Sequence, residues 1–589
     1  MTNVGKGKGQ PPAVVAPSEN LEKHRQQLVE LESGQNLGLV WRDIPEDVET
    51  LLRDEIPVLI HEPDLDIPGK FPSDQSHTLI EGDNLHALHV LQATHSEAVD
   101  VIYIDPPYNT GKEFIYNDKL IDTENTWRHS AWLSFMEKRL RLACALLKSS
   151  GVIFISIDNH EHSRLRLLGE QIFGEPNLIG NLTIVSNLRG RSDSAHFATA
   201  HEYLLVFAKD QRLAKINGFE LSKEVEQTYK MSDSKGRFKP ETLRKRGSNS
   251  LREDAPTLFY PIYWDKKTSR ISISRSSKLD IEITPKLADG REGNWRWSRD
   301  KVLREGNTEL LVLETKGVPT IYVKMRLEGA DGALRTAKPK SVWIDPKYDG
   351  SAGTRLIKQL ITGEFDNPKP LEYIKDVLSI STSTSSIVLD FFAGSGTTLH
   401  AVAELNERDG GTRRCILVTN NENGICRDVT HSRIKAALTG RWADKQKHDP
   451  LPGSLSFYKT GFIKRLKSPD RMRTEIAKHT VDLIAIKEAA GTTVSRTADL
   501  TVLHGLNKTI AVVPGLDPDH VKLHANADKK VREGDHKTVY LFTWSDQGVE
   551  EETAGLWPGW VVQPLPSEML AALRRHAPQL RLFYRDGNK

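Results

Sequence analysis

Four consecutive residues near the start of the chain have types and spacing that could do chemistry. Residues 99–111 read VDVIYIDPPYNTG, so a β-branched and aromatic run stops at Asp105, which Pro106, Pro107 and Tyr108 follow. Proline donates no backbone hydrogen bond and fixes φ, so a strand must end here and the segment after it is stiff. The carboxyl ends of strands in open parallel sheets are where ligands bind. Taken alone, the run favours an ordinary strand-to-loop turn. Other segments must show whether it forms part of a ligand-binding site.

A second candidate site is a glycine-rich turn much later in the chain. The run SSIVLDFFAGSGTTLHAVAELN predicts a strand, a tight turn and a helix. Gly394 and Gly396 would allow the backbone to approach a ligand closely, and the helix N-terminus offers free N–H groups. Asp390 could accept a hydrogen bond from a ligand ammonium group. A dinucleotide site, a phosphate loop and a plain turn all fit this pattern. The run lacks the third glycine of G-x-G-x-x-G and any G-K-[ST], which counts against NAD and nucleoside triphosphates.

Both segments must be positioned by the strands of an α/β sheet. Strand and helix signals alternate over residues 77–210 and resume after residue 345, which predicts a parallel sheet built from βαβ units. Polar residues, short β-like runs and clustered cations between them indicate an inserted, mostly β domain. The predicted domains are a disordered tail (1–18), a helical lead-in (19–76), two halves of the α/β domain (77–210 and 346–440), the insertion (211–345) and a C-terminal α/β domain (441–589).

The composition is that of a globular protein, with 38% hydrophobic and 27% charged residues among 589. No apolar stretch approaches the roughly 20 residues of a membrane span, and the Gly/Pro-rich start lacks an apolar signal core. Three cysteines without CxxC spacing fit a reducing cytoplasm. The net charge is +2, so a nucleic-acid partner would have to show in local clustering.

Two other kinds of chemistry are disfavoured by the sequence. The run DNHEH at 158–162 matches no zinc spacing and follows a predicted sheet strand, so we expect no metal site. The sequence contains no Pro-Cys pair, which excludes the usual cysteine nucleophile of cytosine C5 methylation.

The combination of DPPY with DFFAGSG resembles the amino-methyltransferases of DNA, which use S-adenosylmethionine. DPPY comes first in this chain, an order that matches the permuted β class of that family. FDNPKP at 365–370 and VTNNENGIC at 418–426 look especially like the modification subunits of type III restriction–modification systems. The resemblance covers about residues 20–440. It implies a Rossmann-like methyltransferase fold with a parallel or mixed sheet, an inserted target-recognition domain and a small C-terminal domain.

The resemblance implies roles for Asp105, Pro106, Pro107 and Tyr108, which together are called the acidic platform. Asp105 and the carbonyl of Pro106 would accept the two N–H groups of a target amine, and the prolines would keep these acceptors rigid. Tyr108 would stack on a base rotated out of the duplex. The acidic form DPPY is typical of adenine-N6 enzymes and SPPY of cytosine-N4 enzymes, so cytosine N4 stays as an alternative. A catalytically idle DNA-specificity subunit on the same fold is a second alternative.

The same resemblance implies a set of residues for the cofactor. Its methionine end would contact Asp390, Phe391, Gly394 and Gly396, while Thr397 and Thr398 would line the pocket. Glu422 would accept from the ribose hydroxyls, unless it is a surface acid that Asn420 or Asn421 replaces. Asp83, in the GDN run, would meet the cofactor adenine, or serve as a helix N-cap, or do both.

Residues 211–345 are expected to read the DNA sequence. The stretch KGRFKPETLRKRG holds six cations and one acid, and we expect Arg244, Lys245 and Arg246 to bind phosphates on a mobile loop. A solvated loop with no ligand is the alternative. Trp295 and Trp297 could stack on bases or pack a small core.

The resemblance also implies partners: double-stranded DNA, a second copy of the chain, and a separate helicase–nuclease subunit for restriction. No membrane partner is expected. We expect a bacterial cytoplasmic protein that associates with the nucleoid when it is on DNA. The target sequence cannot be read from these residues.

Overall fold

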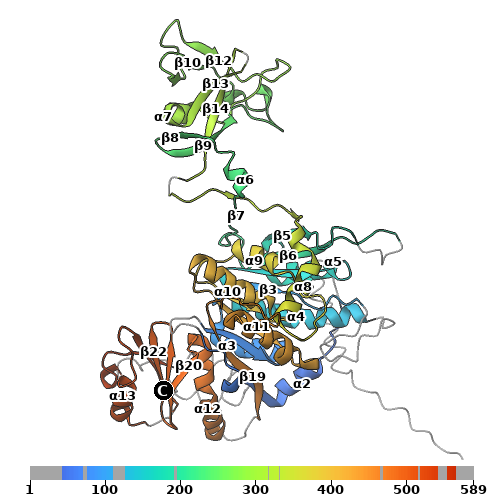
Figure 1. Cartoon of the computed structure of the whole chain (residues 1–589), viewed down its shortest axis with the longest axis vertical. Helices are drawn as coiled ribbons and strands as arrows, with labels where there is room; N and C mark the ends of the chain where they lie inside the picture. The colour runs from blue at the N-terminus through green and yellow to red at the C-terminus, as the bar shows by residue number, and fades with distance from the viewer. Residues whose placement is uncertain are drawn as a thin grey trace, which may run out of the picture. The chain divides into compact units, whose positions relative to one another are not determined.

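The computed structural model describes residues 41–564 apart from 42, 70–75, 111–126, 191–195, 316, 330–331, 465–468, 515–517 and 542–553. The predicted disordered tail, most of the predicted lead-in helix and a closing helix predicted over SEMLAALRRHA therefore lie outside the described residues. The chain divides into two compact units, one formed by residues 217–339 and the other by the rest of the chain (Figure 1).

A ten-stranded mixed sheet forms the centre of the larger unit. Its strands lie in the order β1-β19-β2-β18-β17-β3-β4-β6-β5-β16. The five pairings from β19 to β4 are parallel, whereas β4 and β6 are antiparallel. The bounds in spatial order are Glu55–His61, Ser454–Lys464, Ser76–Glu81, Arg414–Thr419, Ile387–Asp390, Val99–Ile104, Leu147–Ile157, Glu202–Ala208, Leu178–Ile184 and Val342–Trp343. This confirms the predicted Rossmann-like mixed α/β sheet.

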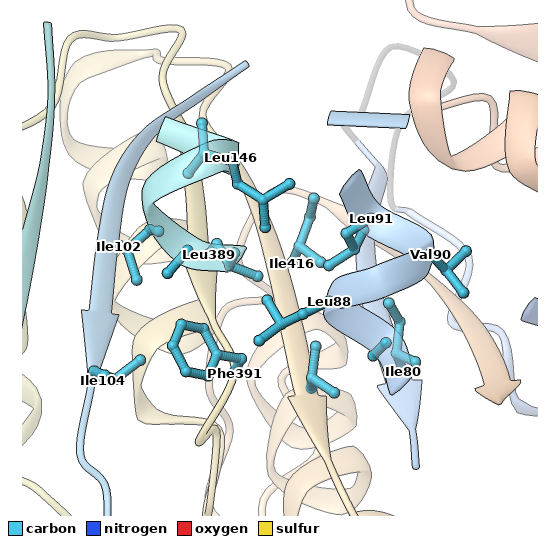
Figure 2. Packing of buried hydrophobic residues seen from close by; sticks show 14 of the residues in the cluster. Ile80, Leu88, Val90, Leu91, Ile102, Ile104, Leu146, Leu389, Phe391 and Ile416 are labelled. Carbon is cyan, nitrogen blue, oxygen red and sulfur yellow. The ribbon is translucent and has the colours of Figure 1, made fainter. Parts of the chain in front are cut away.

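Helices cover this sheet. They are α2 (Asp47–Asp54), α3 (Asn84–His95), α4 (Arg128–Leu146), α5 (His162–Phe173), α8 (Gly350–Leu360), α9 (Leu371–Ser379), α10 (Thr397–Asp409) and α11 (Ser432–Thr439), the last preceded by a π-helical turn over Ile425–His431. Figure 2 shows Ile102 of β3, Leu389 of β17 and Ile416 of β18 near Leu88 of α3 and Leu146 of α4. These strands are buried on both faces, which explains their continuous apolar runs.

Two strands of this sheet come from segments for which the sequence indicated something else. β1 lies within the stretch 19–76 that predicted a helical lead-in, and it pairs with β19 in antiparallel register. β19 lies beyond residue 440, in the predicted C-terminal domain, yet it pairs in parallel with β2. The sheet therefore extends past the range that the methyltransferase resemblance covers.

The remaining described residues of the larger unit form a five-stranded sheet, β20-β21-β22-β23-β24. Its strands are Thr492–Arg496, Thr501–Gly505, Lys508–Val513, His536–Leu541 and Val561–Pro564, accompanied by α12 (Pro469–Glu488) and α13 (His520–Asp528). It has its own hydrophobic cluster, which includes Val502, Trp557 and Trp560.

The unit 217–339 lies inside the range predicted for the insertion and is mostly β. Its larger sheet has the order β13-β14-β9-β8, and a second sheet has the order β11-β10-β12. The bounds are Leu310–Thr315, Val318–Arg326, Gly236–Thr242 and Met231–Asp233, then Ile271–Ser272, Ile262–Trp264 and Ile281–Ile283; the pair β7 (Phe219–Glu220) and β15 (Thr336–Ala337) and the helices α6 (Lys223–Glu226) and α7 (Arg299–Glu309) complete it. Trp264, Trp295 and Tyr260 pack its core, so Trp295 is a core residue.

Candidate active site

The acidic platform and the glycine turn meet at one edge of the ten-stranded sheet. β3 and β17 are parallel neighbours, with Val101 opposite Val388, so both strands end at the same edge. β3 has β4 on its other side and β17 has β18, so the chain proceeds in opposite directions from this pair. Such a topological switch point is where open α/β sheets bind ligands. A cavity of about 370 Å³ lies there, lined by residues that include Asp105–Thr110, Phe365–Lys369, Asp390, Phe392–Ser395, Thr397, Thr398, Asn420 and Ile425.

Asp105 lies in a network of four polar side chains. The Tyr108 hydroxyl donates to Oδ1 of Asp105 at 2.6 Å and is 3.2 Å from Oε2 of Glu202. The Lys369 ammonium donates to the Tyr108 hydroxyl at 2.6 Å and to Glu202 at 2.8 Å, and lies 3.2 Å from Oδ1 of Asp105. One cation thus contacts two carboxylates and offsets part of their negative charge.

Burial sets the ionisation of this network. Burial raises the pKa of Asp105, and Glu202 raises it too, whereas the ammonium of Lys369 lowers it. Burial works to lower the pKa of Lys369, but Asp105 and Glu202 outweigh it, so the pKa of Lys369 is raised and its charge is secured. The pKa of Tyr108 is well above its ordinary value because of burial and the two acids, so it is a neutral donor.

Sequence reasoning missed Lys369 and Glu202. FDNPKP belongs to the family pattern, but its lysine is far from Asp105 in the sequence and precedes α9, so the spacing gives no reason to pair the two residues. Glu202 begins β6, next to β4, and reaches the site through the sheet order. A charged residue at the start of a strand that is otherwise buried is the signal that could have indicated Glu202.

The DPPY segment is held in place by side chains from neighbouring helices and loops. Nε1 of Trp132, which is fully buried on α4, donates to the carbonyl of Pro107 at 2.7 Å. Asn109 has a left-handed backbone (φ 56°) and donates from Nδ2 to Oε1 of buried Glu161 at 2.6 Å. His129 contacts the same carboxylate oxygen. The stiffness that the prolines predicted is therefore reinforced on both sides of Tyr108.

The glycine turn is organised by Asp390. Its Oδ1 accepts from the backbone N–H of Phe392 at 3.0 Å, and its Oδ2 accepts from the Thr398 hydroxyl at 2.6 Å. Burial raises the pKa of Asp390 to about 7. Gly394 (φ 49°) and Gly396 (φ 78°) are both left-handed, a conformation that glycine adopts without strain.

The predicted cofactor residues divide into two groups. Asp390, Gly394, Thr397 and Thr398 line the cavity. Phe391 does not: its side chain packs in the hydrophobic core beside Leu389 (Figure 2), and the next residue, Phe392, lines the cavity instead. The alternation of side chains at the strand end explains this exchange.

Gly396, the N-cap of α10, also lies off the cavity lining. A Cβ atom there would come within 3.1 Å of Cγ2 of Thr430. Its constraint is therefore the left-handed turn and the packing on Thr430, and no close ligand approach is needed to explain it.

Asp83 and Glu422 also lie off the cavity lining. Asp83 is the N-cap of α3, accepts from the N–H of Leu85 at 2.7 Å and lies 3.5 Å from Arg139. Glu422 follows β18 in a short 3₁₀ turn, and its buried Oε2 has no hydrogen-bond partner among the described residues. Asn420, two residues earlier, lines the cavity.

The three cations predicted to bind DNA lie together in the unit 217–339. Arg244, Lys245 and Arg246 line a cavity of about 430 Å³ with Arg296, Trp295 and Glu241 among its other residues. Arg296 is paired with Glu241 at 3.2 Å, whereas none of the three forms an ion pair with any described residue. Cations nearby are neutralised: Lys324 and Arg326 each contact Asp233 at 2.8 Å.

This segment is tied into the fold, so the expectation of a mobile loop does not hold for its first half. The N–H of Leu243 donates to Ile321 at 2.9 Å, and that of Lys245 donates to Asn294 at 2.8 Å. Arg244 forms an isolated β-bridge with Trp295. Charge clustering suggested a loop, but the backbone continues the β9 edge against a buried tryptophan.

A family model described as DNA methylase, for N6 and N4 enzymes, matches residues 99–431, more than half of the chain. The chain belongs to this DNA methylase family. The match spans the acidic platform, the inserted unit and the glycine turn.

Curated relatives agree with this membership. The chain is 37% identical over 375 residues to the type III restriction-modification enzyme EcoPI Mod subunit of Escherichia phage P1, covering 58% of this chain and 57% of the relative. It is 36% identical over 350 residues to the type II methyltransferase M.KpnI of Klebsiella pneumoniae, covering 59% and 81%. The Escherichia coli EcoP15I Mod subunit is 31% identical over 399 residues, covering 59% and 58%. The chain thus covers 57% and 58% of the length of these two Mod subunits.

Within the described ranges, no group of three or more His, Cys, Asp or Glu side chains could hold a metal ion. The same part of the chain has no helix with the length and hydrophobicity of a membrane span.

Proposed function

We propose that this chain transfers a methyl group from S-adenosylmethionine to the N6 amine of an adenine in double-stranded DNA. One observation carries the proposal: the Asp105 network and the glycine turn line one cavity at the switch point of the sheet. A methyl donor and an amine acceptor must meet in one place, and the two loops provide the two halves of such a site.

The residues of the cavity fit S-adenosylmethionine. Asp390 accepts one hydrogen bond on each carboxylate oxygen, and each oxygen keeps lone-pair capacity for a ligand ammonium. The left-handed Gly394 presents backbone to the cavity without a side chain. Glu422 does not line the cavity, but its buried Oε2 has no hydrogen-bond partner among the described residues and is an acceptor suited to a hydroxyl such as those of ribose. When bound, S-adenosylmethionine supplies an electrophilic methyl group on sulfonium.

The chain's own residues orient the amine and receive its proton. An exocyclic amine is a poor nucleophile because its lone pair is delocalised into the ring. The carboxylate of Asp105 accepts one of its N–H bonds and favours a geometry in which the lone pair points away from the ring. The raised pKa of Asp105 suits it to take up the proton that the amine loses after methylation. Tyr108 then links Asp105 to Glu202, a second acceptor.

The inserted unit is the proposed target-recognition domain. Arg244, Lys245 and Arg246 are cations without described acidic partners, which suits them to phosphates and makes the affinity salt-dependent. Because Arg244 is held beside Trp295, it is also suited to contact a base edge in the major groove. The target base itself would have to leave the stack to reach Asp105.

The identity of the relatives supports a role as the modification subunit of a type III restriction–modification system in a bacterial cytoplasm. In that role the chain would act on DNA as a homodimer and could associate with a separate restriction subunit. Size-exclusion chromatography with light scattering measures the oligomeric state directly.

Methyl transfer from labelled S-adenosylmethionine to unmethylated genomic DNA tests the proposal. Mass spectrometry of the digested nucleosides should find N6-methyladenine. N4-methylcytosine would favour the cytosine alternative, and no methylated base despite donor and DNA binding would favour an idle specificity subunit. Sequencing of methylated positions then gives the target sequence and the number of strands modified.

A further inference from the structure

A buried arginine lies directly behind the glycine turn. Arg433, on α11, is 1% exposed. Its NH1 group donates to the hydroxyl of Ser395 at 3.0 Å and to that of Thr397 at 2.7 Å. Both hydroxyl-bearing residues line the cavity. Arg433 does not line the cavity itself, but it is hydrogen-bonded to Ser395 and Thr397, which do.

The charge of Arg433 has no acidic partner. No carboxylate of the described residues forms an ion pair with it, and its buried Nε has no hydrogen-bond partner there. Burial lowers the pKa of Arg433 to about 9, so the guanidinium is still charged near neutral pH. The nearby acid Glu404 is already paired with Lys375 at 2.6 Å. A buried, unpaired charge is costly, so its retention points to an anion that arrives later.

Other buried arginines of the same unit do have partners. Arg139 forms an ion pair with Glu46 at 2.9 Å, and Arg413 forms one with Asp409 at 2.7 Å. Both are as buried as Arg433 or nearly so. The lack of a carboxylate is therefore particular to the arginine behind the cavity among these three.

The direction of these hydrogen bonds indicates that the cavity offers a hydroxyl donor to a ligand. A guanidinium can only donate, so the Ser395 and Thr397 hydroxyls both accept from Arg433 and keep their own protons to give. The two oxygens are 3.2 Å apart, so one hydroxyl can donate to the other and at least one O–H remains. The only other acceptor of Thr397 in the described structure, the carbonyl of Lys369, is 3.5 Å away, at the limit of a hydrogen bond.

We propose that Arg433 is a positioning residue for the carboxylate of S-adenosylmethionine, which it attracts by charge and orients through the hydroxyls of Ser395 and Thr397. The inference rests on the proposed function, because it assumes that the amino-acid end of this ligand enters at the glycine turn. It assigns to α11 a part in cofactor selection that sequence motifs do not indicate.

Ligand dissection on the full chain tests this role. Calorimetry compares S-adenosylmethionine with its decarboxylated analogue, which keeps the adenosine, the sulfonium and the amine. In the unmodified protein the carboxylate should improve Kd by about tenfold or more, as expected for a charge-assisted hydrogen bond. Arg433→Gln should reduce that ratio to about threefold or less. Arg433→Lys, which keeps the charge, should preserve most of it.

Controls separate positioning from structure. Arg413→Gln removes a similarly buried arginine that pairs with Asp409, the last residue of α10, and it should leave the ratio of the two affinities unchanged. A loss of affinity for both ligands by the same factor in Arg433→Gln would overturn the proposal, because a merely structural arginine predicts that. An unchanged ratio of the two Kd values in Arg433→Gln, with both affinities intact, would overturn it as well.

A second variant covers the case in which Arg433→Gln does not fold. The double variant Ser395→Ala, Thr397→Val removes both hydroxyls and should lose the same carboxylate advantage, and retention of the full ratio would refute the relay. If the unmodified chain binds neither ligand, the proposed function itself fails. That result differs from failure of this inference, in which the unmodified chain binds and the ratio is insensitive to Arg433.

Discussion

Replacing Lys369 by methionine tests whether one buried ammonium sets the ionisation of Asp105. The ammonium nitrogen lies 3.2 Å from Oδ1 of Asp105 and 2.8 Å from Oε2 of Glu202. Methionine keeps the length and most of the packing of the lysine stem while it removes the charge. The variant therefore changes the electrostatics of the cavity more than its shape.

The size of the effect follows from the geometry. Two unit charges 3.2 Å apart interact by about 5 kcal/mol at an effective dielectric constant of about 20. Since 29% of the Asp105 side chain is exposed, solvent screens part of this energy, and we take about 2 kcal/mol as the remainder. A free energy of this size changes an ionisation equilibrium by about 30-fold.

The sign is fixed by the causes of the shift. Burial and Glu202 raise the pKa of Asp105 and Lys369 lowers it, so removing Lys369 raises that pKa further. The carboxylate is the acceptor for the amine, so the pH midpoint of methyl transfer should move upward in Lys369→Met, with the rate reduced below that midpoint and recovered as the pH rises. Adding Glu202→Gln should restore part of the loss, because it removes a neighbouring negative charge.

Initial rates of methyl transfer over a pH series, at saturating donor and DNA, measure this. Lys375→Met is the matched control: Lys375 pairs with Glu372 at 2.8 Å and Glu404 at 2.6 Å and does not line the cavity. Its pH profile should coincide with that of the unmodified enzyme. If the Lys369→Met profile differed only in height, with the same midpoint, Lys369 would not control the ionisation of Asp105.

Three further predictions rest on other parts of the structure. Asp105→Ala should abolish methyl transfer and leave the donor affinity nearly intact, because it removes only the amine acceptor; calorimetry and a turnover assay decide, and near-normal turnover would refute the assignment. Neutralising Arg244, Lys245 and Arg246 should lower the slope of log K against log salt by about 0.9 for each lost phosphate contact, measured with target and scrambled duplexes. A loss of discrimination at a single base pair would instead indicate that one of them reads a base edge. Because burial raises the pKa of Asp390 to about 7, above its ordinary 3.8, the folded state holds a proton that the unfolded state releases, so its contribution to stability falls between those two pH values. Asp390→Asn should reduce the slope of the free energy of unfolding against pH over that window, by up to about 1.4 kcal/mol per pH unit. If denaturant titrations at several pH values gave the same slope for the variant and the unmodified protein, the raised pKa would be contradicted.

The sheet was largely predictable because its strands carry strong local signals. Runs such as VDVIYI and IVLDFF are apolar at all but one position, which is typical of strands that helices cover on both faces. The edge strand β1 was harder to predict as a strand, because EIPVLIH contains a proline and follows a charged helical segment. Its strand conformation depends on pairing with β19, which is far away in the sequence.

The candidate site was predictable to the extent that its residues form contiguous motifs. Asp105, Tyr108 and Gly394 follow strands directly, so the sheet order is enough to place them. Lys369 and Arg433 act through partners that tertiary structure supplies, and neither sits in a run whose spacing suggests chemistry. Phe391 shows that the motif does not identify single cavity residues, because Phe391 lies only in the core whereas the next residue, Phe392, lies in the core and also lines the cavity.

Each of the two units has a hydrophobic core of its own. The chain leaves the ten-stranded sheet after β6 and returns to it at β16, and between them the unit 217–339 forms its own core around Tyr260, Trp264 and Trp295. The core beneath the cavity, which includes Leu389 and Phe391, shares no described residue with it. The cations that we assign to DNA and the residues that we assign to the methyl donor are therefore supported by independent packing. Neutralising the cations should leave the affinity for S-adenosylmethionine in the absence of DNA unchanged, and a large loss of that affinity would mean that the two units depend on each other.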